Sequence, residues 1–372
     1  MSILGKKEIF LISLVLSTLV SGCRVTYLFH VGAGHFRLLN GAIPVEEALR
    51  EDVLDSREKA HLCLVARVKD FGETHLGLKR THNYQTVSLS SRQSRIYTVS
   101  ACPKDRLLRK TWWFPIVGDM PYLGFFDLNK ARAEKERLAA TGLDVTIGKA
   151  DAYSTLGWFR DPLTLNLIKG DTAALVEIIL HEMTHATLYL KGEGEFNETL
   201  AVLVGKVGAF QFLRSTYGPT HSLTTEARNS IEDERIFSSF LNSVLEDLEH
   251  LYRSQIEYRE KLFQREKIFA DAIQHFNHLR KRFQTPSFNG FGKAGINNAY
   301  LLSISLYHRY FHLFEALLRR NEDSIPDLLA SLENMAGEKG AIMDTVRKWA
   351  GGKSAENLRL NGLSLKSGRI DG

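Results

Sequence analysis

Proline, cysteine and blocks of like charge are all scarce in this sequence of 372 residues. Eight prolines and 28 glycines exclude a collagen-like repeat, and the composition is not that of a disordered chain or a multi-span membrane protein. Basic residues number 48 and acidic residues 43, and the basic ones are spread along the chain rather than clustered. We therefore expect no nucleic-acid partner. The 44% of hydrophobic residues can bury one large core or two modest ones, so the sequence predicts a globular protein.

The N-terminus has the pattern of a bacterial export signal. Two lysines precede an apolar run over residues 9–20, which is too short to span a bilayer comfortably. The run ends in the sequence Val-Ser-Gly followed by Cys23, which resembles a lipobox. We expect residues 1–22 to be removed and Cys23 to be lipidated, which places the body in the cell envelope, facing the periplasm or the cell surface. The alternative is an N-terminal anchor helix, which leaves the body on the same side of the membrane.

Two cysteines remain once Cys23 is assigned to lipid. Cys63 and Cys102 would lie in an oxidising compartment, where they can pair as a disulfide or stay as separate buried thiols. The sequence does not choose between these alternatives.

Periodicity divides the chain into a mixed N-terminal part and a helical C-terminal part. A long amphipathic stretch in the second part is expected to form a structural helical hairpin. The predicted helices span residues 25–78, 129–140, 171–190, 197–213, 225–283, 298–320 and 324–334, and the predicted extended segments span residues 84–117, 144–147 and 152–159.

The clearest motif is a His-Glu-x-x-His string at residues 181–185, on one of the predicted helices. Residues four apart on an α-helix are separated by about 40° after a full turn, so His181 and His185 project from one face and can ligate one metal ion. Glu182 lies at the edge of the same arc, where it can act as a general base. Such a string also arises by chance, and two histidines can occupy a helix face without a metal. The capped, amphipathic helix that follows predicted strands favours the metal site.

A catalytic zinc site usually has a third protein ligand besides the two histidines. Glu198 is favoured, because a short connection brings the first turn of the next predicted helix back beside His185. Glu193 and Glu195 are alternatives in the connecting loop, where a ligand would be held less rigidly.

This set of residues predicts hydrolysis of a peptide bond. Zn²⁺ would polarise the scissile carbonyl, while Glu182 would take a proton from water and pass it to the leaving amine. A second donor to the oxyanion is expected, and Tyr307 is the candidate, with His308 and Tyr153 as alternatives. Each of these three side chains can equally be a packed or exposed residue without a catalytic role.

Beyond the zinc motif, the chain resembles a family of bacterial aminopeptidases of the gluzincin type, which are predicted lipoproteins. The resemblance covers roughly residues 25–320 and rests on five blocks in order: Trp113-Phe114-Pro115-Ile116-Val117-Gly118, Ala152-Tyr153-Ser154-Thr155-Leu156-Gly157-Trp158-Phe159, His181-Glu182-Met183-Thr184-His185, Phe196-Asn197-Glu198 and Ile296-Asn297-Asn298-Ala299. It implies zinc ligands at His181, His185 and Glu198, with Glu182 catalytic. It also implies that residues 152–159 form the edge strand that gluzincins lay along a bound peptide. The substrate-binding residues expected in that strand are Tyr153, Ser154, Thr155 and Gly157.

One position departs from the gluzincin pattern. Many gluzincins place a polar residue four positions after the ligand glutamate, where it hydrogen-bonds a zinc histidine, and this chain has Val202 there. Support for that histidine must come from elsewhere or be weaker. Glu193 or Glu195 is a candidate for binding the α-ammonium group of a substrate, with simple solvation as the alternative. Asn197 is a further candidate for substrate contact.

The sequence therefore predicts an α+β fold of the zincin type, with a mixed sheet, an active-site helix pair and a largely helical C-terminal portion. The expected regions are a lipoprotein signal peptide (1–22), a zincin-like catalytic domain (23–224), a helical domain (225–350) and a flexible tail (351–372). The predicted function is that of a membrane-anchored zinc aminopeptidase acting on peptides. Two alternatives stay open: a non-catalytic lipoprotein that uses the zincin scaffold for binding or assembly, and amide hydrolysis on a cell-wall fragment. The sequence predicts no oligomeric state.

Overall fold

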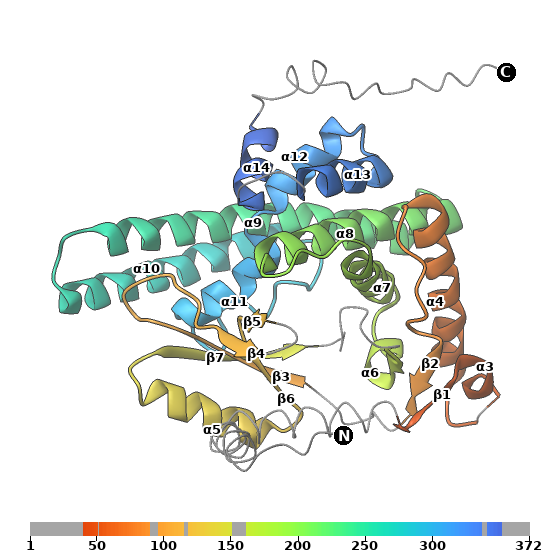
Figure 1. The fold of residues 1–372 in the computed structure, drawn as a ribbon, viewed down its shortest axis with the longest axis horizontal. Coiled ribbons are helices and arrows are strands. Elements are labelled where there is room, and N and C mark those ends of the chain that lie inside the picture. Colours follow the sequence, from red (N-terminus) through yellow and green to blue (C-terminus); the bar gives the residue numbers. More distant parts are fainter. Residues whose placement is uncertain are drawn as a thin grey trace, which may run out of the picture.

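Helices make up most of this α+β protein, and its strands form small sheets (Figure 1). The computed structural model describes residues 40–50, 52–89, 96–114, 118–150, 161–336 and 341–351. The elements of the first half are β1 (Ala42–Pro44), α3 (Val45–Ala48), α4 (Ser56–His75), β2 (Thr86–Ser88), β3 (Ile96–Cys102), β4 (Trp112–Phe114), β5 (Gly118–Met120), β6 (Leu123–Phe125), α5 (Leu128–Ala139), β7 (Asp144–Ala150), β8 (Leu163–Thr164), α6 (Leu165–Ile168) and α7 (Thr172–Thr187). Those of the second half are α8 (Gly194–Tyr217), α9 (Ser222–Arg253), α10 (Tyr258–Leu279), the 3₁₀ helix η2 (Arg280–Arg282), α11 (Asn298–His308), α12 (Phe311–Arg320), α13 (Ile325–Ala336) and α14 (Ile342–Ala350). Within the described ranges, no helix combines the length and apolar character needed to cross a bilayer.

The described strands pair in three separate sheets, and only one of these is mixed as the sequence predicts. In the mixed sheet, β2 is antiparallel to β1 and parallel to β8. In the second sheet, β3 is antiparallel to both β6 and β7, with Val99 opposite Leu123 on one side and Ile147 on the other. β4 and β5 form a hairpin. The α+β class is confirmed, but the strands do not join in one sheet.

The largest hydrophobic core surrounds α7 and α8. It takes in Leu62 of α4, Leu180 of α7, Leu203 of α8 and Phe314 of α12, all almost fully buried. Neighbours cover α8 on several sides, so this helix is apolar around most of its circumference rather than on one stripe. Both helices that carry the site described below are therefore held by packing along their length.

The helices α9 and α10 form the helical hairpin predicted for residues 225–283 (Figure 1). A second core fills the space between them and contains many phenylalanines. Phe237 stacks on Phe288 at 4.0 Å between ring centroids and meets Phe276 edge-on at 6.2 Å. Each aromatic pair of this kind stabilises the fold by about 0.5–1.5 kcal/mol, in addition to the contribution of its buried apolar area.

A buried ion pair attaches the β6-β3-β7 sheet to the helices. Asp144 begins β7, and one of its carboxylate oxygens accepts from Arg265 of α10 at 2.7 Å and from the backbone N–H of Asn298 at 3.1 Å. The same guanidinium donates to the carbonyl of Lys104 at 2.8 Å. Both charged groups are satisfied by several partners, as buried charges require.

Several predicted element boundaries are wrong. The predicted N-terminal helix contains strand β1, because Pro44 has no N–H for a helix interior and the segment pairs with β2 instead. The helix predicted over residues 298–320 is interrupted at Arg309 and Tyr310, between α11 and α12. The second site helix begins at Gly194, three residues before the predicted Asn197. Residues 152–159 and the predicted tail from residue 352 onward lie outside the described residues.

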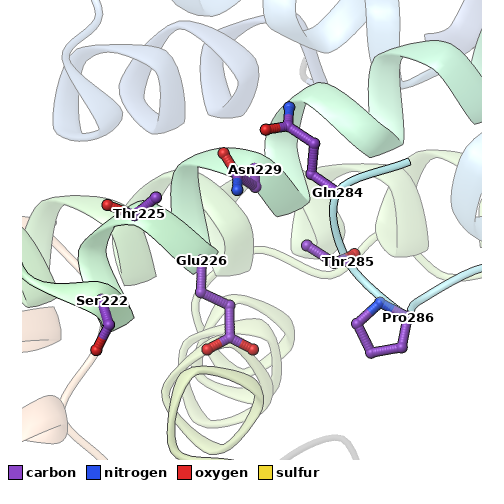
Figure 2. Close-up of a pocket in the computed structure, with 7 residues that line it drawn as sticks. All are labelled: Ser222, Thr225, Glu226, Asn229, Gln284, Thr285 and Pro286. Atoms are coloured by element: carbon purple, nitrogen blue, oxygen red, sulfur yellow. The ribbon is translucent and has the colours of Figure 1, made fainter. Parts of the chain in front are cut away.

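A pocket of about 310 Å³ opens between the start of α9 and the segment 284–286 (Figure 2). Its lining is mostly neutral and polar, with Glu226 as the one carboxylate among the lining residues. A single carboxylate in an open pocket does not define a ligand, so the pocket carries no functional assignment.

Candidate metal centre

Helix α7 positions the two histidines of the motif. Its N-cap is Asp171, whose carboxylate accepts from the backbone N–H groups of Ala173 at 2.8 Å and Ala174 at 3.1 Å. Buried side chains recur along one face of the helix down to its last turn. His181 and His185 lie one turn apart on this fixed helix.

The connection from α7 to α8 is closed by a side chain. Asn197 accepts from the backbone N–H of Leu190 at 2.8 Å and donates to the carbonyl of the same residue at 2.7 Å. Gly192 supplies the left-handed backbone angle of the turn, with φ 85°. Because Asn197 attaches the loop to α8, the neighbouring Glu198 is brought back beside His185. The amide of Asn197 is engaged by this loop, and the substrate contact expected of Asn197 stays a prediction.

A glycine allows α7 and α8 to approach closely. A Cβ atom on Gly205 would lie 2.9 Å from the carbonyl oxygen of Glu177 and 3.3 Å from the Cβ of His181. The first distance is shorter than non-bonded packing permits, so no larger residue fits here without moving the helices apart. The close crossing is what lets Glu198 reach the two histidines.

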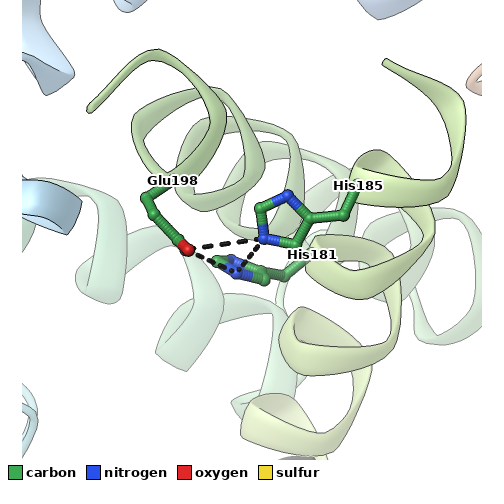
Figure 3. A group of neighbouring side chains, drawn as sticks. All are labelled: His181, His185 and Glu198. Atoms are coloured by element: carbon green, nitrogen blue, oxygen red, sulfur yellow. Dashed lines mark hydrogen bonds and ion pairs between the residues drawn. The ribbon is translucent and has the colours of Figure 1, made fainter. Parts of the chain in front are cut away.

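Three side-chain atoms converge between the helices (Figure 3). The Nε2 atoms of His181 and His185 lie 3.2 Å apart, and the Oε2 atom of Glu198 lies 3.5 Å from the first and 3.4 Å from the second. His185 is buried, while His181 and Glu198 keep some exposure. Among the described residues, these three form the one cluster of histidine, cysteine and carboxylate side chains compact enough to hold a metal ion.

The triangle of donor atoms has the dimensions of a zinc site. Zinc bonds nitrogen and oxygen at about 2.0–2.2 Å with tetrahedral geometry, which places neighbouring ligand atoms about 3.3–3.6 Å apart. The observed separations of 3.2, 3.5 and 3.4 Å agree with this spacing. Two imidazoles and one carboxylate are also a ligand set found in catalytic zinc sites. The three residues therefore fit the ion that the sequence predicts.

The pKa values of Glu198 and His185 are both shifted in this cluster. Burial alone would raise the pKa of Glu198, but the adjacent His185 and His181 hold that pKa well below its ordinary value. Burial alone would lower the pKa of His185, and the Glu198 carboxylate reverses this so that its pKa is raised. Glu198 is thus a carboxylate, the form that a metal ligand needs.

Glu182 and Tyr307 lie beside the cluster. The Oε2 atom of Glu182 is buried and has no hydrogen-bond partner among the described residues. The ring of Tyr307 stacks on that of His181 with 6.5 Å between centroids. The Glu198 carboxylate, together with burial, raises the pKa of Tyr307 well above its ordinary value, so this phenol stays a proton donor. Thr199, which follows Glu198, bonds the carbonyl of Leu306 at 3.3 Å and fixes α11 to α8 beside this tyrosine.

Two tyrosines near the cluster were not predicted. The ring of Tyr189 meets His185 edge-on at 6.3 Å. Burial, and then the Glu182 carboxylate, raise the pKa of Tyr84 well above its ordinary value. Tyr84 also has a left-handed φ of 65°, unusual for a bulky residue and often associated with functional sites. Neither residue belongs to a motif, so the sequence carries no signal for them.

The other predicted residues divide into those near the cluster and those engaged elsewhere. Glu195 pairs with Arg109 at 2.8 Å, so its charge is already balanced. Glu193 stands at the N-cap position of α8 without a capping hydrogen bond. His308 is engaged by another residue, since its Nδ1 bonds Glu234 at 2.7 Å. Outside the described residues lie Cys23, Tyr153, Ser154, Thr155 and Gly157.

The structure also bears on Val202 and on the two cysteines. Val202 is buried in the main core, and the Nδ1 atom of His185 has no hydrogen-bond partner among the described residues. Whether a zinc histidine is supported from elsewhere or more weakly stays a prediction. Cys63 is exposed and Cys102 is buried, and both are free thiols. The two cysteines therefore do not form the disulfide that the sequence left open, and Cys102 alone is a buried thiol.

The fold and cluster define an α+β protein with a two-histidine, one-carboxylate centre on a crossed helix pair. A family model described as "Putative aminopeptidase" matches residues 26–343, and the chain belongs to that family. No curated protein and no solved structure matches the chain. Family membership supports a peptidase acting on peptide substrates.

Proposed function

We propose that the protein is a zinc metallopeptidase of the gluzincin type, with His181, His185 and Glu198 as the ligands of one Zn²⁺. The observation that carries the proposal is the triangle of three donor atoms with separations of 3.2–3.5 Å, the spacing of tetrahedral zinc ligands. Membership of an aminopeptidase family supports the same activity. The crossed helices that hold the triangle support a zincin-like catalytic region.

The protein side chains divide the proton transfers between them. When bound, the ion supplies Lewis-acid polarisation of the scissile carbonyl and makes a water molecule more acidic. Glu182 accepts a proton from the attacking water, because its buried Oε2 has no other partner among the described residues. It then returns this proton to the leaving amine. Tyr307 donates a hydrogen bond to the developing oxyanion from beside His181.

Substrate binding is proposed for the segment 152–159 and for Glu193. The segment would run along the peptide backbone through Tyr153, Ser154, Thr155 and Gly157. Glu193 is the better candidate for the substrate α-ammonium, since Glu195 is already paired with Arg109. We also propose that Cys23 carries lipid and anchors the protein in the bacterial envelope, outside the cytoplasm.

The test compares the zinc-loaded native chain with Glu182→Gln on a mixed peptide library, in one set with free N-termini and in a second set with acetylated N-termini, and on muropeptides as a third substrate. We expect one zinc per chain in both proteins, and cleavage of free peptides by the native chain alone. Zinc binding without Glu182-dependent cleavage would instead support a non-catalytic zincin scaffold. Cleavage of acetylated peptides would make the protein an endopeptidase, and cleavage of muropeptides alone would point to a cell-wall substrate.

A further inference from the structure

A chain of buried charges runs behind the metal centre and links four helices. Lys206 of α8 is almost fully buried, and its Nζ lies 3.0 Å from a carboxylate oxygen of Glu177 on α7 and 2.7 Å from Ser230 Oγ on α9. The same ammonium lies 3.7 Å from Glu234 of α9, whose side chain is fully buried. The other carboxylate oxygen of Glu234 bonds His308 Nδ1 on α11 at 2.7 Å.

Both ends of this chain of charges lie close in sequence to residues of the metal centre. At one end, Glu177 precedes His181 by a single turn of α7. At the other end, His308 directly follows Tyr307, whose ring stacks on His181. In the middle, Lys206 follows Gly205, which has no room for a Cβ atom against α7. This chain of charges therefore contacts every helix that supplies a ligand or the proposed oxyanion donor.

We propose that Lys206 and His308 are positioning residues: the buried chain Glu177–Lys206–Glu234–His308 fixes α7, α8 and α11 against α9 and so holds the ligand triangle and Tyr307 in register. This inference rests on the proposed function for the role of Tyr307. Its claim about the ligand triangle concerns metal binding and does not depend on catalysis.

The physical basis is that one buried cation balances two carboxylates. Burial alone would lower the pKa of Lys206, but Glu177 and Glu234 more than offset it, so the ammonium form is stabilised. Burial alone would raise the pKa of Glu234, and His308 and Lys206 reverse this. Removing the ammonium would take the cation away from the fully buried Glu234 carboxylate and from the partly exposed Glu177, and the helices would have to shift to solvate Glu234.

The first test measures zinc affinity of the full-length purified chain by competition with a chromophoric chelator. Lys206→Met should weaken zinc binding at least about tenfold, as loss of a supporting residue around a metal site does. Lys206→Arg, which keeps the charge, should stay within about threefold of the native chain. The matched control is Lys261→Met on α10, whose ammonium bonds only the carbonyl of Tyr252 at 2.9 Å among the described residues. Unchanged affinity in a folded Lys206→Met, or equal losses in the control, would overturn the proposal.

The second test covers the case in which Lys206→Met does not fold. His308 is partly exposed, so His308→Ala should fold, bind zinc with nearly native affinity and show about a tenfold lower kcat with little change in KM. If His308 acts through Tyr307, adding His308→Ala to Tyr307→Phe should cause almost no further loss of kcat. Multiplicative losses would mean that His308 has only a general structural role.

Failure of the proposed function gives a different result. If no Glu182-dependent hydrolysis is found, the peptidase proposal fails, while the zinc-affinity comparison of Lys206→Met with Lys261→Met still decides whether the buried chain positions the ligands. If hydrolysis depends on Glu182 but Tyr307→Phe leaves kcat unchanged, the peptidase proposal stands and the role of His308 is overturned.

Discussion

Glu198 joins two histidines that the motif alone leaves as an incomplete site. Its carboxylate lies 3.4–3.5 Å from both imidazole nitrogens, and their charges keep it ionised. The nearby carboxylates differ in what they already contact. Glu195 is neutralised by Arg109, and Glu193 stands at the end of the loop. Only Glu198 points its oxygen at the histidine pair in the described residues.

This difference gives a direct prediction at the residue scale. Glu198→Gln should lower zinc affinity by about a hundredfold or more, because it removes a charged ligand, whereas outer support residues alone account for about 10–100-fold. Glu193→Gln, five positions earlier, is the matched control and should change affinity less than about twofold. Isothermal titration of metal-free protein with zinc measures both. Equal affinities for Glu198→Gln and the native chain would remove Glu198 from the ligand set.

The two described cysteines give a second prediction at this scale. Burial raises the pKa of the Cys102 thiol to about 12, so almost no thiolate forms near neutral pH, while Cys63 is exposed. In a chain carrying Cys23→Ser, a thiol reagent at about pH 8 should label one cysteine in the native protein and two after denaturation. Mass spectrometry of the labelled peptides identifies which cysteine has reacted. A Cys63–Cys102 disulfide, or rapid native labelling of Cys102, would contradict the structure.

The site residues differ in how far sequence can reveal them. The spacing of His181 and His185 fixes their common helix face from the period of the α-helix alone. Glu198 follows from a short connection between two helices. Tyr84 and Arg109 approach the site through contacts between segments far apart in the sequence, and no local pattern reports such contacts.

At the scale of elements, the crossed pair of α7 and α8 determines the site. The sequence predicts both helices and a connection of six residues, and the structure has six residues, 188–193, between them. The predicted start of α8 is three residues late, because Gly194 has a low helix propensity while Asn197 resembles a cap. Asn197 instead binds the loop through its side chain from within the first turn.

The close crossing predicts the effect of a single methyl group. Gly205→Ala would place its Cβ 2.9 Å from a backbone carbonyl of α7, which cannot rotate away, so we expect a loss of about 1–3 kcal/mol in unfolding free energy and weaker zinc binding. Gly290→Ala is the control, since its Cβ would meet nothing within 4 Å, and it should change stability by less than about 0.5 kcal/mol. Urea unfolding of both variants makes the comparison. Equal stabilities would show that the helices can separate freely.

At the scale of the whole molecule, local patterns predict the elements better than their arrangement. The helical hairpin of α9 and α10 follows from periodicity and is confirmed. The parallel pairing of Val87 in β2 with Leu163 in β8 joins segments 76 positions apart and leaves no trace in either strand. The same holds for the ion pair of Asp144 with Arg265. Long-range pairing and buried charge networks depend on tertiary packing, which periodicity does not encode.

The buried chain of charges also makes the stability of the molecule depend on pH. Glu234 has a folded-state pKa below its ordinary value of 4.5, because His308 and Lys206 outweigh its burial. A depressed pKa stabilises the folded state above about pH 4.5, and this contribution is lost as the pH falls through the lower folded pKa. Between about pH 5 and 3, the unfolding free energy of the native chain should therefore fall more steeply than that of Glu234→Gln. Parallel curves in thermal unfolding across this range would contradict the assignment.

The central claim is that His181, His185 and Glu198 bind one zinc ion, and anomalous diffraction tests it most directly. Crystals of the purified protein, grown with one equivalent of zinc, would be measured above and below the zinc absorption edge. The account predicts one anomalous peak within about 2.0–2.2 Å of both Nε2 atoms and of a Glu198 carboxylate oxygen. A zinc peak bound by other residues, or none at this triangle, would contradict it.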